Sequence, residues 1–298
     1  MKRKLVKQGA ATMMISLPSK WIKANSLEKG DEIDLENLGK NLVISIKSPE
    51  KKLETSIKLT SLTESSIRTL ITNTYRESYD KINVEFENNE QFKILKRVIE
   101  TRLIGFEITK KQQKSCTVEN ITEPSPDQFD NLLNKIFLNI EELFEITKKR
   151  LNDEEAEDFE EVADRIQKYD NFCRRIIVKR KLVEKNSEMF WSFLSSIIRA
   201  YRELYYLNKA TDKKIKVSEK TKELLQDSEE VFSMIIEAYK NKDIEKLNKI
   251  HELEKQGIKK AYFLLETKKG KENIIIYRIC SSIRQFYQAV SPLTGLLM

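Results

Sequence analysis

Residues 12–22 read Thr12-Met-Met-Ile-Ser-Leu-Pro-Ser-Lys-Trp-Ile22. Met13, Ile15 and Leu17 alternate with the residues between them, which is the period of a half-buried strand. Pro18 suits the first position of a helix, because its φ angle is fixed and its missing N–H is not needed there. This stretch therefore predicts a strand followed by a short helix that runs through Trp21.

A hairpin is predicted after this helix. Lys29-Gly30-Asp31 reads as a turn, and residues 33–35 and 42–46 carry alternating apolar residues on either side of a second turn at residues 38–40. Fewer than fifty residues of this kind bury little apolar surface alone. An obligate dimer, in which two copies interleave, would solve that problem.

Positive charge is concentrated at the start of the chain. Six basic residues precede the first acid, Glu28; they are Lys2, Arg3, Lys4, Lys7, Lys20 and Lys23. A basic block is often only a solvated face, but a block on one strand and the following helix also suits contact with phosphates. The two interpretations stay open on the residues alone.

This region resembles the swapped-hairpin domain of the AbrB/SpoVT/MazE type. The resemblance is carried by Gln8-Gly9, by Ile15-Ser-Leu-Pro-Ser-Lys-Trp21 and by Leu27-Glu-Lys-Gly-Asp-Glu-Ile33. It implies an interleaved β dimer that binds DNA, although some members of the family only dimerise. Carried over by position, the DNA-binding candidates are Arg3, Lys4, Lys7, Lys20 and Lys23.

Residues 53–123 predict a small domain that follows a polar linker. Strands are expected at 55–59, 82–86, 105–109 and 116–121, with helices starting near Thr63 and running from Phe92 to Leu103. The order β-α-β-α-β-β favours a small sandwich with helices on one face of the sheet. With no phosphate-binding glycine loop and no catalytic spacing here, we expect a spacer or dimerisation module.

The remainder is predicted to be helical after the break at Pro124-Ser125-Pro126. Six apolar stripes of period 3.6 fall in residues 126–210 and 217–298, which favours two tandem three-helix bundles or one six-helix array. An internal repeat supports the division, because residues 196–203 (Ser-Ile-Ile-Arg-Ala-Tyr-Arg-Glu) match residues 281–288 (Ser-Ser-Ile-Arg-Gln-Phe-Tyr-Gln). Trp21 and Trp191 fit core positions. The expected fold class is thus multidomain α+β with a mostly α-helical C-terminal part.

This domain order resembles the archaeal branch of the PhoU family of phosphate-uptake regulators. The two repeat segments and Tyr169-Asp170-Asn171-Phe172 carry the resemblance, which spans about residues 126–298. PhoU-like bundles are associated with metal clusters on acidic helix motifs. Here Ile166 and Gln288 stand where the pattern has acids. The resemblance therefore disfavours a full metal cluster and leaves a single divalent or iron ion at Asp170 or at Glu203 as the alternative, and no cofactor is expected.

The sequence also bears on an anion site and on a catalytic site. Arg199 and Arg284, at equivalent positions of the repeat, could hold an anion or make structural salt bridges. His251 is the one histidine and no nucleophile signature surrounds any Ser or Cys, so the sequence predicts no enzyme.

Composition limits the class of protein. The chain has 298 residues, 34% of them charged, with a net charge of +7. Three scattered cysteines argue against a disulfide framework and for a reducing compartment. No leader and no apolar run of roughly 18 residues is seen, so a soluble, cytoplasmic protein is expected that is not membrane-embedded.

The leading hypothesis is a dimeric, DNA-binding transcriptional regulator, and the resemblance would link it to phosphate uptake. The rival is an adaptor whose first domain only dimerises while its helical faces bind a phosphate transporter ATPase or a sensor protein. A metal-storage or metal-sensing bundle is the third alternative.

Overall fold

The computed structural model describes residues 3–9, 12–38, 41–46, 52–122, 128–180, 186–211 and 216–298. The chain forms two compact units, Met1–Lys51 and Lys52–Met298. Residues 39–40 of the turn predicted at 38–40, the linker at 48–51 and the break at Pro124-Ser125-Pro126 lie outside the described residues.

The first unit contains two small antiparallel pairs and one short helix. Strand β1 (Val6–Gln8) pairs with β2 (Thr12–Met14), helix α1 covers Ser19–Ala24, and β3 (Ile33–Leu38) pairs with β4 (Asn41–Ile46). The predicted helix and hairpin are confirmed, and the side chain of Asn25 ends the helix by donating to the carbonyl of Trp21. The strand predicted before Pro18 is confirmed in part as β2, and its partner β1 is an addition to the predicted elements.

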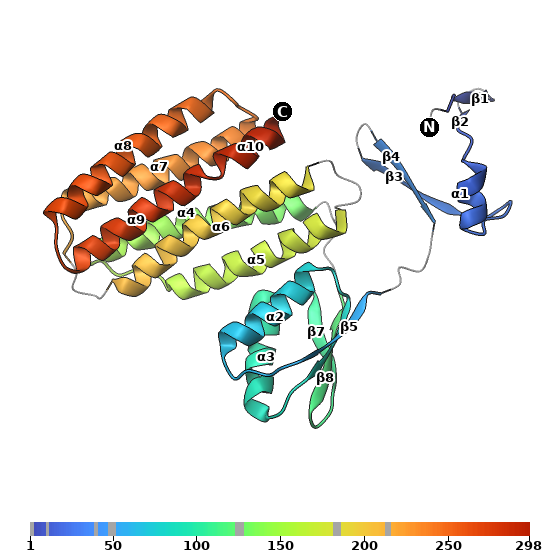
Figure 1. Ribbon diagram of the computed structural model, residues 1–298, viewed down its shortest axis with the longest axis horizontal. Helices are drawn as coiled ribbons and strands as arrows, with labels where there is room; N and C mark the ends of the chain where they lie inside the picture. The colour runs from blue at the N-terminus through green and yellow to red at the C-terminus, as the bar shows by residue number, and fades with distance from the viewer. Residues whose placement is uncertain are drawn as a thin grey trace. The chain divides into compact units, whose positions relative to one another are not determined.

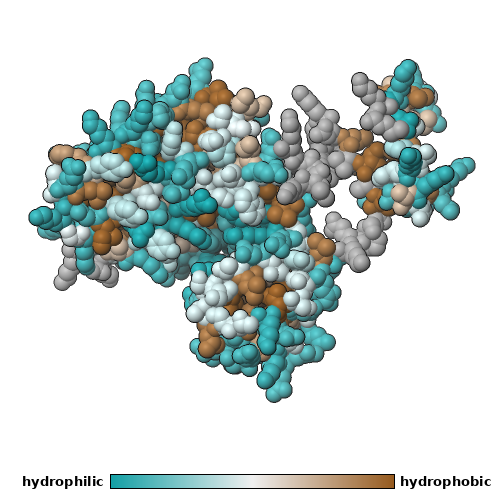
Figure 2. Space-filling model, viewed as in Figure 1, coloured by the Kyte–Doolittle hydropathy of each residue, from teal (hydrophilic) through white to brown (hydrophobic). Residues whose placement is uncertain are grey.

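No described side chain of this unit is buried. Leu17, Trp21, Ile22 and the inward positions of the β3–β4 hairpin are only half-buried. Seven large apolar side chains are at least 42% exposed; they are Leu5, Val6, Met13, Met14, Ile15, Leu35 and Leu42. Figure 2 shows hydrophobic residues at the surface of this unit beside strongly hydrophilic ones. The first unit therefore presents apolar surface that a single copy does not cover.

The second unit begins with the predicted β-α-β-α-β-β order. Its elements are β5 (Glu54–Lys58), α2 (Glu64–Arg76), β6 (Lys81–Glu85), α3 (Asn89–Arg102), β7 (Phe106–Lys111) and β8 (Ser115–Asn120). The strand order is β5-β6-β8-β7, parallel between β5 and β6 and antiparallel elsewhere. Ile82 and Val84 of β6 are buried, whereas the residues that alternate with them are not. The two helices accordingly cover one face of the sheet (Figure 1), as predicted.

The rest of this unit is helical. The helices are α4 (Phe129–Leu151), α5 (Phe159–Arg180), α6 (Ser187–Ala210), α7 (Glu219–Asn241), α8 (Lys246–Thr267), α9 (Lys271–Tyr287) and α10 (Val290–Leu297). Gly270, at φ +70°, separates α8 from α9 at the predicted break, because this left-handed conformation favours glycine. In the part of the chain that the structure describes, no helix is long and apolar enough to cross a membrane.

The helices predicted as two triplets pack on one another. Helix α6 runs along α9, and α4 contacts α7 (Figure 1). Phe286 of α9 lies 6.1 Å from Phe144 of α4 and 5.0 Å from Phe232 of α7, measured between ring centroids. Helices from both triplets thus share one aromatic core.

Two helices of the α/β part pack on the helical part. Both α2 and α3 contact α5, so α5 packs against the α/β part and against the other helices of the helical part.

The prediction that Trp191 lies in the core is wrong, since Trp191 is 36% exposed. Its ring lies against the guanidinium of Arg174, whose carbon is 4.5 Å from the ring centroid. Cation–π stacking at the surface of α6 explains an aromatic residue there.

Candidate functional site

The five predicted DNA-binding residues are all exposed cations. Arg3, Lys4 and Lys7 lie before or on β1, and Lys20 and Lys23 lie three residues apart on α1. That spacing puts the two lysines on neighbouring positions of one helix face. None of the five is ion-paired within the described residues. Unpaired, exposed cations are free to contact phosphates, and DNA binding by these five residues stays a prediction.

Asp170 lies at the centre of a buried polar network on α5. Its side chain is 1% exposed. One carboxylate oxygen accepts from Nη2 of Arg76 at 3.0 Å, and the other accepts from Nε of Arg174 at 2.8 Å. The neighbouring Asn171 accepts from Nε of Arg76 at 2.9 Å and donates to the carbonyl of Arg102 at 2.8 Å. The network therefore ties α2 and the end of α3 to α5.

These contacts bear on the predicted metal ligands. Each oxygen of Asp170 already accepts a charged hydrogen bond from an arginine, so a metal ion would have to displace a guanidinium. Glu203 on α6 accepts from Nη1 of Arg278 at 2.8 Å. Among the described residues, no group of three or more His, Cys, Asp or Glu side chains could hold a metal ion. Metal binding at Asp170 or Glu203 stays a prediction.

The predicted anion residues stand apart from this network. Arg199 is exposed on α6 and has no ion pair among the described residues. Arg284 is exposed on α9 and donates to the hydroxyl of Tyr262 at 3.1 Å. Anion binding at the two arginines likewise stays a prediction.

The one histidine, His251, contacts a tyrosine. Its Nδ1 lies 2.8 Å from the hydroxyl of Tyr287.

Arg175 is the most deeply buried charge of the described chain, with no exposed side-chain surface. Its Nη1 donates to the carbonyls of Tyr75 and Tyr79, both at 2.9 Å, and its Nη2 donates to Asp80 at 2.5 Å. The guanidinium carbon lies 5.0 Å from the ring centroid of Phe106. Arg175 thus anchors α5 to the segment that links α2 to β6.

The pKa of Asp80 lets us predict how the free energy of unfolding changes at acidic pH. Partial burial alone raises its pKa, but Lys179 and Arg175 outweigh this effect and hold the pKa below its ordinary value. A lowered pKa means that ionised Asp80 stabilises the folded state. This stabilisation is complete above the unfolded-state pKa of about 3.9 and is lost as the pH falls through the lower folded-state pKa. We expect the free energy of unfolding to fall more steeply below about pH 4 in the wild type than in Asp80→Asn. Urea unfolding across this pH range measures the difference, and parallel curves would contradict the assignment.

The arginines that dominate these contacts were not predicted from the sequence. Asp170 and Arg174 have i,i+4 spacing, which was a usable signal for a pair on one helix face. Arg174 and Arg175 also interrupt an apolar stripe between Cys173 and Ile176, which was a second signal. Their partners Arg76 and Asp80 carry no comparable signal, because they lie on distant segments.

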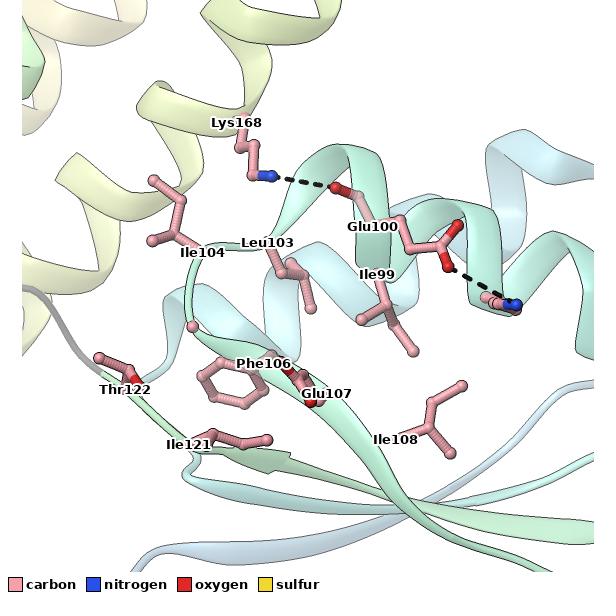
Figure 3. Close-up of a pocket in the computed structure, with 12 residues that line it drawn as sticks. Ile99, Glu100, Leu103, Ile104, Phe106, Glu107, Ile108, Ile121, Thr122 and Lys168 are labelled. Atoms are coloured by element: carbon pink, nitrogen blue, oxygen red, sulfur yellow. Dashed lines mark hydrogen bonds and ion pairs between the residues drawn. The ribbon is translucent and has the colours of Figure 1, made fainter.

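A hollow of about 630 Å³ lies beside this region, between α3, β7 and α5. Figure 3 shows Ile99, Leu103, Phe106 and Ile108 among its lining side chains. Lys168 reaches across and donates to the carbonyl of Glu100 at 3.0 Å. The second lysine of this hollow, Lys96, lies 3.7 Å from the carboxylate of Glu100. Its two lysines are balanced by Glu100 and Glu107 and much of its wall is apolar, so this hollow lacks the positive charge that a phosphorylated ligand requires.

Comparisons with protein-family models, with characterised proteins and with solved structures found no match for this chain. The resemblances to AbrB-type and PhoU-type proteins therefore rest on the motifs quoted above.

Proposed function

We propose that this protein is a dimeric, DNA-binding transcriptional regulator that acts in the cytoplasm. One observation carries the proposal: the first unit combines five exposed cations, which have no ion pair among the residues that the structure describes, with apolar side chains that one copy leaves uncovered. Apolar patches of this kind mark association surfaces, and cations without carboxylate partners suit a phosphate backbone.

The occupant of the apolar surface is a second copy of the first unit. Each copy has too few residues for a core of its own, and pairing two copies buries side chains such as Met13, Ile15 and Leu35. A two-fold dimer also duplicates the cations, so that ten positive side chains face one duplex. The helical part then acts as the sensor or partner-binding part, and the resemblance to PhoU proteins links the signal to phosphate uptake.

Charge reversal tests the DNA contact. In Lys4→Glu/Lys7→Glu we expect the affinity for the DNA upstream of the protein's own gene to fall by roughly tenfold or more at low salt, because two phosphate contacts become repulsive. Fluorescence anisotropy measures the affinity, and analytical ultracentrifugation verifies that the dimer persists.

The matched control is Lys255→Glu/Lys259→Glu. These two lysines are exposed on α8, and the substitution changes the net charge by the same amount. The control should bind DNA nearly as tightly as the wild type. Equal losses in both variants would mean that overall charge, and not the N-terminal surface, controls binding.

An adaptor is the second candidate function. It is favoured by apolar side chains on α8 and α9 that are about half exposed, namely Tyr262, Phe263, Ile274 and Tyr277. These side chains offer a surface for a protein partner such as a phosphate transporter ATPase or a sensor protein. A chain that dimerises but does not bind DNA at low salt would favour this function.

A further inference from the structure

Helices α2, α5 and α6 enclose a second hollow of about 600 Å³ within the Lys52–Met298 unit. Its charged lining consists of Arg68, Arg76, Arg102, Arg202, Lys209 and a single carboxylate, Asp164. We call this hollow the arginine pocket. Its volume lies within the range of about 300–1,000 Å³ that is typical of small-molecule sites.

Four of the five cations have carboxylate partners, most of which lie outside the lining. Arg102 lies 2.6 Å from Asp164, which lines the pocket. Arg76 shares Asp170 with Arg174, as described above. The two remaining pairs are long, and their side chains are between 37% and 55% exposed: Arg68 with Glu64 at 3.8 Å and Lys209 with Glu160 at 3.5 Å.

Arg202 is the exception, since it has no ion pair among the described residues. Its positive charge also acts on Arg76. Burial lowers the pKa of Arg76; Asp170 opposes this effect, and the charges of Arg174 and Arg202 add to it. Cations that repel one another around one hollow become favourable neighbours when an anion binds between them.

The kind of cation and the neighbouring groups narrow the class of anion. A guanidinium is planar and donates in pairs, which matches the oxygens of a phosphate group better than the point charge of a lysine does. The arginines come from α2, from the end of α3 and from α6, so their charge is spread around the wall. Tyr205 and Tyr206, with ring centroids 5.6 Å apart, add aromatic surface to the same lining.

We propose that the arginine pocket binds an oligophosphate, an anion with two or more linked phosphate groups. Inorganic pyrophosphate and a nucleoside diphosphate share this chemistry, and the tyrosines would favour the nucleotide by stacking on its base. This inference goes beyond the proposed function. It concerns residues of the second unit and holds whether or not the first unit binds DNA.

Isothermal titration calorimetry of the full-length protein tests the proposal, with pyrophosphate, ADP and orthophosphate as separate probes in magnesium-free buffer. The decisive variant is Arg202→Ala, which removes an exposed side chain that has no ion-pair partner in the described part of the chain and should fold normally. The matched control is Arg199→Ala, an exposed arginine on the same helix that does not line the pocket. Circular dichroism verifies the fold of both variants.

We expect saturable binding of pyrophosphate or ADP that weakens roughly tenfold or more in Arg202→Ala, because a charged hydrogen bond is lost. Binding should be nearly unchanged in Arg199→Ala and in Lys4→Glu/Lys7→Glu. Tighter binding of ADP than of pyrophosphate would identify a nucleotide ligand, and the reverse order would identify an inorganic one.

Three results with the probes and the Arg202→Ala variant would overturn the proposal. They are no binding of either oligophosphate, binding that Arg202→Ala leaves intact, and orthophosphate binding as tight as that of pyrophosphate. A loss of binding in Lys4→Glu/Lys7→Glu alone would also overturn it, because the anion would then occupy the first unit. None of these results depends on DNA binding, so this proposal and the proposed function fail separately.

Discussion

Asp170→Asn should lower the free energy of unfolding by about 3–5 kcal/mol, the usual loss when one partner of a buried ion pair is removed. The amide that replaces the carboxylate carries no charge to balance Arg76 and Arg174. It also presents one acceptor and one donor where both guanidinium groups need acceptors. Urea unfolding of the full-length protein, followed by circular dichroism, measures the change.

The matched control for this prediction is Glu142→Gln. Glu142 also accepts from an arginine, Arg165, at 2.7 Å, but both side chains are at least 40% exposed. An exposed pair contributes about 0–1 kcal/mol. Equal, small losses in the two variants would contradict the central role of Asp170.

The Asp170→Asn variant also tests whether Asp170 balances arginines or binds the predicted metal ion. If Asp170 only balances arginines, a chelator should leave the unfolding curve of the wild type unchanged. If Asp170 is a metal ligand, elemental analysis should find stoichiometric metal in the wild type and less in Asp170→Asn.

Arg175→Met is the second substitution with a large expected effect. Methionine fills much of the same space but donates no hydrogen bond, so the carbonyls of Tyr75 and Tyr79 and the carboxylate of Asp80 lose a donor. Buried acceptors without partners cost about 1–3 kcal/mol each, so we expect a loss of roughly 3–5 kcal/mol. The effect should appear as faster amide hydrogen exchange in α2 and α5, because Arg175 joins them.

Lys179→Met is the matched control for Arg175. Lys179 lies 3.4 Å from the same carboxylate, but its side chain is 29% exposed. Its substitution should cost no more than about 1 kcal/mol. A similar loss in both variants would mean that the charge of Asp80, and not the buried anchor, sets the stability of this contact.

Periodicity predicted the regular elements well because each one carries its signal locally. The alternation at residues 82–86 and the helical spacing from Phe92 to Leu103 depend on one buried face, and the structure shows that face. Strand β1 was missed because only Leu5 and Val6 are apolar in residues 3–9, and two adjacent residues show no alternation.

The polar contacts were less accessible to sequence reasoning. Arg76 and Asp170 are 94 residues apart, and Asp80 and Arg175 are 95 residues apart. The local sequence around a charged residue on a helix is the same whether that residue contacts water or a distant carboxylate. The arginine pocket was missed for this reason, although the repeat drew attention to Arg199, three residues before Arg202.

The salt dependence of DNA binding tests the central claim most directly. The experiment compares the full-length protein with residues 52–298, a unit that has its own core and should fold alone. We predict that the affinity of the full-length protein falls steeply with salt, with a log–log slope of about −0.9 for each phosphate contact. We also predict that residues 52–298 do not bind. Absence of binding at low salt by a dimeric full-length protein, or undiminished binding by residues 52–298, would contradict the account.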